Sequence, residues 1–283
     1  MSLVGLSENQ IISSLQDLGL KSGSVVFVHS SLSSIGYVSG GADTVVDSLL
    51  RVINPNGTLV VPTFTDFQII ASDSIFDPFQ DRSDMGRISE IARTRPESLR
   101  SIHLTHSMAA MGPHTAEITK VQGASCWSGE GPFWQLHYLD AQIMLLGVPY
   151  LRSTFFHVIE QHVQTPYRYF EDVQAQVKQP DGTTRPLPTR TFKSKPDFPG
   201  NDFNKFGSIL EKRGLVKIGT VGNAICRLFK ARDAMEVGVE EYRKDPSVFV
   251  QTEEQLTSLD DGVMVGEYDN EKTVMDPEEM FNS

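Results

Sequence analysis

The sequence lacks the features of a membrane protein, a disulfide-rich secreted protein or a zinc-knuckle protein. No run of about eighteen apolar residues occurs in its 283 residues, so no membrane-spanning helix is expected. The segment Met1–Gln10 lacks the basic-then-apolar pattern of a signal peptide. Only two cysteines are present, Cys126 and Cys226, and neither belongs to a C-x-x-C pair. The composition therefore excludes a zinc knuckle and favours a protein of the reducing cytoplasm.

Charge is distributed unevenly along the chain. The formal net charge is −11, of which the segment Gln251–Ser283 carries −9 and the rest about −2. The nearly neutral body contains no basic stripe, so binding to nucleic acid is disfavoured. The acidic segment is either a solvated extension or a feature that attracts a cationic substrate.

Helical and strand patterns alternate over the first half of the chain. A capping box at Ser7–Gln10 opens a helix that Gly19 ends. Short apolar runs predict further strands and helices. The predicted strands are Val25–Val28, Leu59–Val61, Ala141–Val148 and Leu215–Val221, and the predicted helices are Ala42–Val52, Met85–Thr94, Pro132–Leu139, Asn204–Arg213 and Asn223–Tyr242. This order predicts an α/β fold of three layers, α/β/α, with a mostly parallel central sheet.

The pattern changes after Tyr167. Val173–Val177 alternates polar and apolar residues, Asp181-Gly182 is a hairpin turn, and Thr184–Phe192 returns. We expect a β-hairpin insertion at about residues 170–195. Residues 1–250 are then expected to form a single domain, followed by the acidic extension 251–283.

His157 and Glu160 form the first candidate site. Residues three apart lie on one face of a helix, so the carboxylate can fix the imidazole tautomer and stabilise its protonated form. The pair follows the predicted strand Ala141–Val148, and open α/β sheets bind ligands beyond the ends of their strands. His157 is therefore predicted to act as a general base, oriented by Glu160. Thr154, three residues before His157, shares the same face and is expected to bind substrate.

Two further clusters have the composition of binding sites. His103, His106 and Ser107 could supply hydrogen-bond donors to a developing oxyanion. Small hydroxyl residues follow the strand at Val25–Val28, and Gly40-Gly41 precedes a helix whose free amides suit a phosphate group. No G-x-G-x-x-G fingerprint or Walker lysine accompanies them.

Blocks of sequence in a fixed order carry a family resemblance. They are Val25–Gly36, Gly40–Val45, Asn56–Thr65, Arg100–Gly112 and Asp140–Val148. In this order and spacing they resemble the aminoglycoside 3-N-acetyltransferase family, over about residues 6–250.

The resemblance implies an acyl-CoA-dependent N-acyltransferase that uses acetyl-CoA or another short acyl-CoA and no metal. The amine of an amino sugar would attack the thioester directly in a ternary complex, with His157, Glu160, His106 and Thr154 as catalytic residues. Coenzyme A would be held by residues of the first four blocks, namely His29, Ser30, Ser31, Leu32, Ser33, Gly40, Gly41, Thr63 and Ser107. The acceptor would be an aminoglycoside antibiotic or, alternatively, a nucleotide-linked amino sugar, and a homodimer stays open.

Other classes of function also fit some of these residues. His157, Glu160, His162, His103 and His106 could bind zinc, although H-x-x-E is not the H-E-x-x-H pattern. Cys126 could carry an acyl group as a nucleophile. A coenzyme A or sugar-nucleotide binding protein without turnover is a further alternative, which the intact His157 and Glu160 oppose.

Truncation before Gln251 tests the role of the acidic extension. We expect unchanged transfer kinetics at every salt concentration, because alternating charge and sparse apolar residues rarely sustain a packed segment. A higher KM at low salt that fades near physiological ionic strength, where the Debye length is about 8 Å, would instead indicate steering of a cationic acceptor. A lower melting temperature alone would indicate packing through Val263–Val265.

Overall fold

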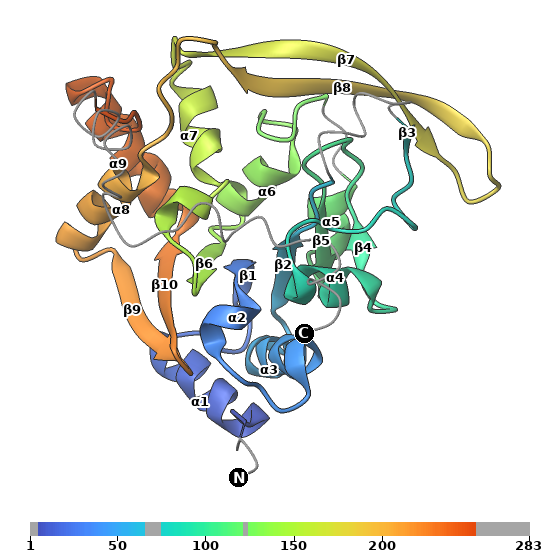
Figure 1. The fold of residues 1–283 in the computed structure, drawn as a ribbon, viewed down its shortest axis with the longest axis vertical. Coiled ribbons are helices and arrows are strands. Elements are labelled where there is room, and N and C mark those ends of the chain that lie inside the picture. The colour runs from blue at the N-terminus through green and yellow to red at the C-terminus, as the bar shows by residue number, and fades with distance from the viewer. Residues whose placement is uncertain (1–4, 66–74, 121–123, 253–283) are drawn as a thin grey trace.

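The computed structural model describes residues 5–65, 75–120 and 124–252. Seven strands form a central sheet in the order β4-β5-β2-β1-β6-β10-β9 (Figure 1). Their bounds are β1 Val25–Ser30, β2 Thr58–Pro62, β4 Leu99–Arg100, β5 Met108–Met111, β6 Gln142–Leu146, β9 Val216–Val221 and β10 Ala224–Lys230.

The sheet is mixed, with its parallel strands at the centre. Strand β1 pairs parallel with both β2 and β6. Strands β5 and β10 pair antiparallel with β2 and β6, and the outer strands β4 and β9 pair antiparallel with β5 and β10. The carboxyl ends of β1 and β6 therefore meet at one edge of the sheet, as the sequence predicted for strands that position a site.

Helices cover both faces of the sheet, so the predicted three-layer α/β/α fold is confirmed. One face packs against α1, α3 and α4, and the other against α5 to α9. The helix bounds are α1 Glu8–Leu18, α2 Leu32–Ile35, α3 Gly41–Ile53, α4 Arg87–Thr94, α5 Thr115–Thr119, α6 Pro132–Tyr138, α7 Phe156–His162, α8 Phe203–Lys212 and α9 Ala231–Lys244, with a 3₁₀ turn η2 at Tyr150–Arg152.

The predicted β-hairpin insertion is present as β7 (Arg168–Lys178) and β8 (Thr184–Ser194). Figure 1 shows it as a long ribbon that crosses one end of the molecule. With β3 (Ile75–Phe76) it forms a second sheet of three strands. Its turn contains Gly182 at φ 84°, a left-handed conformation that glycine adopts without strain. The base of the hairpin lies next to α7.

The capping signals predicted for the first helix are also confirmed. Ser7 and Gln10 form the predicted capping box, and Gly19 ends α1 at φ 108°. In the part of the chain that the structure describes, no helix combines the length and the apolar composition needed to cross a membrane.

One helix prediction was wrong over part of its length. The segment Asn223–Tyr242 begins as strand β10 and becomes helical only at Ala231. Apolar residues in β10 fit a helical period, but the segment is fully paired with β6 and β9. Long-range pairing therefore overrides the local pattern. Residues 253–283 of the acidic extension lie outside the described residues, so the boundary near residue 250 stays a prediction.

Gly207 provides a test of how α8 packs against the segment that leads to α7. A Cβ atom at Gly207 would overlap the ring of Tyr150, which cannot move away easily because Glu211 accepts its hydroxyl at 2.9 Å. We expect Gly207→Ala to lower the free energy of unfolding by about 1–3 kcal/mol, although alanine favours helices. Urea denaturation measures this change. Ser208→Ala, on the exposed side of the same helix, is the control, and an equally stable Gly207→Ala would contradict this packing.

Candidate active site

His157 and Glu160 lie on α7 and contact each other. The distance from His157 Nδ1 to Glu160 Oε2 is 2.5 Å. The Glu160 side chain is fully buried, whereas the His157 side chain is 18% exposed. The helical spacing that the sequence indicated therefore produces a buried carboxylate beneath a partly accessible imidazole.

Glu160 is also held by three side chains from other segments. Tyr167 Oη donates to Glu160 Oε1 at 2.9 Å, and Asn201 Nδ2 donates to the same oxygen at 2.6 Å. The Arg168 Nε lies 3.0 Å from Glu160 Oε2 and forms an ion pair with it. With His157, four side chains satisfy one buried carboxylate, which is the condition for burying such a charge.

The electrostatics of the pair favour a neutral imidazole and an ionised carboxylate. Burial lowers the pKa of His157, the Glu160 charge partly offsets this, and Arg168 lowers it further. Burial alone would raise the pKa of Glu160, but its contacts with His157, Arg168 and Tyr167 hold it below its ordinary value. An ionised Glu160 accepts a hydrogen bond from Nδ1–H of His157, which leaves Nε2 as the basic nitrogen.

Trp127 lies at the centre of the predicted catalytic residues. Its ring is 5.5 Å from that of His157 and 4.6 Å from that of His106. Its Nε1 donates to the backbone oxygen of Thr154 at 3.3 Å. The Thr154 Oγ1 lies 3.2 Å from His29 Nε2, at the carboxyl end of β1. The structure therefore brings His157, His106 and Thr154 together around one tryptophan and joins His29 to them through Thr154.

His106 is partly buried and contacts two aromatic rings. Besides Trp127, Phe64 lies 4.6 Å from it, and Thr105 Oγ1 contacts its Nδ1 at 2.7 Å. Burial lowers the pKa of His106 well below the usual value, and the charges of His103, His157 and Arg168 add to this. Burial also lowers the pKa of His29 to about 3. Both imidazoles are neutral at physiological pH and serve as hydrogen-bonding groups.

Thr63 and Ser107 lie in a separate buried network. Their hydroxyl oxygens are 3.0 Å apart, and Ser107 donates to the Thr63 carbonyl at 2.7 Å. Arg100 donates to Ser107 Oγ at 2.9 Å and to the Thr63 carbonyl at 2.6 Å. Both hydroxyls are thus hydrogen-bonded to other protein groups. The role of Thr63 and Ser107 in holding coenzyme A stays a prediction.

The remaining predicted cofactor residues lie along the edge where β1 ends. Ser30 is the last residue of β1, and Ser31 caps the short helix α2, which contains Leu32 and Ser33. The Ser31 amide donates to the Leu146 carbonyl at 2.9 Å, which ties this loop to β6. Gly40 and Gly41, at φ 83° and 63°, begin α3.

The structure also bears on two alternatives, a metal site and a cysteine nucleophile. His103, His106 and Cys126 place one potential ligand atom each within 4.8 Å of one another, without His157 or Glu160. However, His103 Nδ1 already accepts the backbone amides of Thr105 and His106. Burial raises the pKa of Cys126 well above the usual value, so the thiol is not activated for nucleophilic attack.

Sequence reasoning missed Trp127, Tyr167, Arg168 and Asn201. Trp127 is one of only two tryptophans in the chain, which is the one sequence signal that could have drawn attention to it. Tyr167 and Arg168 follow α7 closely, but no helical spacing links them to Glu160 because the helix has already ended at His162. Asn201 lies 41 residues from Glu160, and only the tertiary fold brings it near α7.

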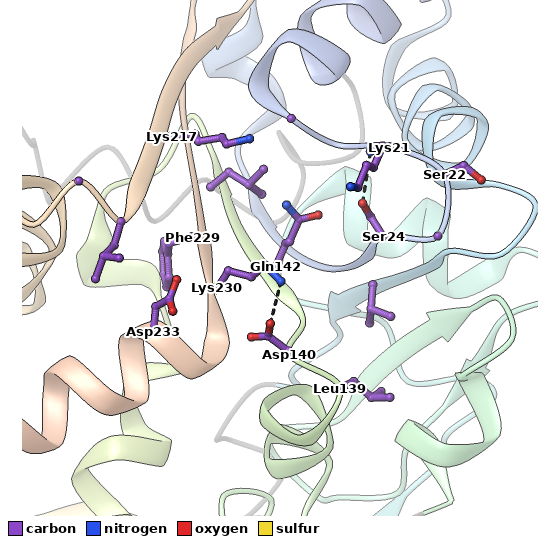
Figure 2. A pocket seen from close by; sticks show the side chains of 16 residues that line it. Lys21, Ser22, Ser24, Leu139, Asp140, Gln142, Lys217, Phe229, Lys230 and Asp233 are labelled. Carbon is purple, nitrogen blue, oxygen red and sulfur yellow. Dashed lines mark hydrogen bonds and ion pairs between the residues drawn. The ribbon is translucent and has the colours of Figure 1, made fainter.

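A pocket of about 550 Å³ lies elsewhere, at the amino ends of β1 and β6. Figure 2 shows Lys21 and Lys217 reaching into it from different segments, with the Lys230–Asp140 ion pair at its base. Among the predicted site residues, none lines it. The pocket therefore lies at the opposite end of these strands from His29.

Comparisons with known proteins identify the family. The family model of aminoglycoside 3-N-acetyltransferases matches residues 27–243. YokD, an aminoglycoside N(3')-acetyltransferase-like protein of Bacillus subtilis, is 32% identical over 81% of this chain and 90% of its own. Aminoglycoside N(3)-acetyltransferase VII of Streptomyces paromomycinus is 28% identical over 83% and 90%.

Solved structures agree with this match. The apoenzyme of aminoglycoside acetyltransferase AAC(3)-IVa superposes with a TM-score of 0.74 at 27% identity, covering 90% of this chain and 95% of that one. The predicted class of enzyme, an N-acetyltransferase, is confirmed by these relatives. The chain therefore belongs to the aminoglycoside 3-N-acetyltransferase family.

Proposed function

We propose that the protein transfers an acetyl or other short acyl group from coenzyme A to a primary amine of an aminoglycoside. The observation that carries this proposal is the contact of 2.5 Å between His157 Nδ1 and the buried Glu160 carboxylate. A neutral imidazole with an ionised carboxylate on Nδ1 is the arrangement of a general base. The class of reaction is indicated by the protein's membership of the aminoglycoside 3-N-acetyltransferase family.

The proposed reaction is a direct transfer within a ternary complex. Amines of amino sugars are mostly protonated at neutral pH and must lose a proton before they attack. That first proton is released to solvent, and the neutral amine then attacks. Nε2 of His157 accepts the second proton from the amine nitrogen as this nitrogen bonds to the thioester carbonyl carbon. The carbon–sulfur bond then breaks, and the leaving thiolate takes up the proton. Glu160 stabilises the imidazolium that exists between these two steps.

Neighbouring residues support the base in this proposal. Thr154 and His29 join the carboxyl end of β1 to the segment before α7, at 3.2 Å. His106 provides a neutral group next to Trp127, which also contacts His157. The donor is proposed to lie along the loop of Ser30–Ser33 and the amino end of α3. The first amides of a helix have no partner within that helix, and the amino end of α3 therefore suits a diphosphate.

The acceptor class rests on the relatives. A histidine-to-alanine mutant of AAC(3)-IVa, 27% identical to this chain, has been solved in complex with a gentamicin. A binding protein without turnover would not need His157 neutral above an ionised, fully buried Glu160. This arrangement favours an enzyme over the non-catalytic alternative.

Replacing the base tests the mechanism. We expect His157→Ala to reduce kcat by about two to four orders of magnitude, the range of a general base, and Glu160→Gln to cost less because the imidazole remains. Thiol release with acetyl-CoA and an aminoglycoside panel measures both. His162→Ala, an exposed histidine on the same helix, is the control and should retain turnover. Full activity of His157→Ala would rule out this mechanism.

Binding of the donor is a separate test. Coenzyme A should raise the melting temperature, because a ligand that binds only the native state stabilises it, by about 2.7 kcal/mol at a hundredfold excess over Kd. The same increase is expected with and without a metal chelator. A folded sample that shows no shift at millimolar coenzyme A would contradict the assigned donor.

A further inference from the structure

Arg168 lies between the β-hairpin and the candidate base. It is the first residue of β7, and its side chain is only 8% exposed. Its Nε lies 3.0 Å from Glu160 Oε2, and its Nη2 donates to Asn201 Oδ1. Phe192 and Phe198 hold the guanidinium at 5.4 and 5.6 Å from their ring centres. The charge is thus fixed in position by aromatic contacts and by the same asparagine that binds Glu160.

A buried carboxylate needs this second cation. When His157 is neutral, it supplies Glu160 with a hydrogen bond but no positive charge. Tyr167 and Asn201 are neutral donors as well. Arg168 is therefore the full positive charge in contact with Glu160 before the amine is deprotonated, and a buried ion without a counter-ion is strongly unfavourable.

We propose that Arg168 is a positioning residue of the transfer reaction, which keeps Glu160 ionised and directed at His157 Nδ1 and thereby links the base of the hairpin to the catalytic histidine. This inference rests on the proposed role of His157. The inference goes beyond that role because it assigns a function to Arg168, which touches neither the substrate nor the reacting atoms.

The direction of the pH effect follows from the charges around the pair. Among the described residues, the titratable or charged groups that interact with His157 and Glu160 are Arg168, Tyr167 and His106. His106 and Tyr167 are neutral near pH 7, since burial lowers the pKa of the first and raises that of the second. Arg168 thus favours the unprotonated pair. Without Arg168 the pair takes up a proton at higher pH, whichever partner receives it, and a protonated pair cannot act as a base.

The experiment compares Arg168→Met and Arg168→Lys with Arg190→Met. Arg190 is a matched control, because it lies on the same hairpin, pairs with Asp172 at 2.8 Å and lies 5.6 Å from the ring centre of Phe170, but does not reach Glu160. Two readouts are needed for each protein. One is the pH profile of kcat/KM, and the other is an NMR titration of the His157 ring, assigned by its absence in His157→Ala.

For Arg168→Met we expect kcat to fall about tenfold and the acid limb of the profile to move up by about one pH unit or more. The His157 resonance should titrate at correspondingly higher pH. Arg168→Lys retains the charge without the planar fork, so the acid limb should stay close to that of the wild type while kcat recovers only in part. Arg190→Met should match the wild type in both readouts.

Several outcomes would overturn the inference. They are a loss of kcat at every pH with an unchanged His157 titration, an equal shift in Arg190→Met, or a shift as large in Arg168→Lys as in Arg168→Met. If Arg168→Met does not fold, two other variants provide the test. They are Arg168→Lys and the double variant Arg168→Met with Glu160→Gln, which leaves no unpaired buried charge. In the double variant, loss of Arg168 should add little to the effect of Glu160→Gln on kcat. If the wild type transfers no acyl group, the proposed function fails, yet the titration still tests the role of Arg168.

Discussion

The burial of the Glu160 carboxylate constrains the rest of the site. A charge with no exposed surface must be matched by donors and by a cation, or it will take up a proton. Here the matching groups come from α7, from Tyr167 and Arg168 at the start of the hairpin, and from Asn201 before α8. The first two segments are neighbours in the sequence, whereas Asn201 lies 41 residues from Glu160 and is brought to it by the fold. The orientation of His157 thus depends on the assembled fold.

The arrangement of strands explains why the site lies where it does. Parallel pairing of β1 with β6 brings the end of β1, with His29, next to the segment that leads into α7. The antiparallel pair β2–β5 places Thr63 and Ser107 at the same edge. The mixed character of the sheet does not change this rule, since its central strands remain parallel.

The sequence predicted what local spacing determines. The capping box at Ser7, the glycine at the end of α1, the strands with continuous apolar runs and the pair His157–Glu160 all depend on residues a few positions apart. It could not predict what depends on distant pairing. Ala224–Lys230 has a helical pattern of apolar residues and becomes a strand because β6 and β9 supply its hydrogen bonds. For the same reason Asn201 could not be linked to Glu160, and the partners of Thr63 and Ser107 could not be foreseen from their spacing. Arg168 is near Glu160 in sequence but lies beyond the end of α7, where the helical spacing no longer applies.

The two ends of the hairpin differ in their surroundings. Its base carries Arg168 and Phe192, which contact the network of Glu160, whereas residues 180–186 around the turn are exposed and no atom lies within 4 Å of where a side chain of Gly182 would begin. Lengthening this turn costs little, because doubling a flexible loop adds only about 0.6 kcal/mol of closure entropy. The turn is therefore a place where residues can be inserted at little cost, while the contacts of Arg168 with Glu160 at the other end of the same two strands stay intact.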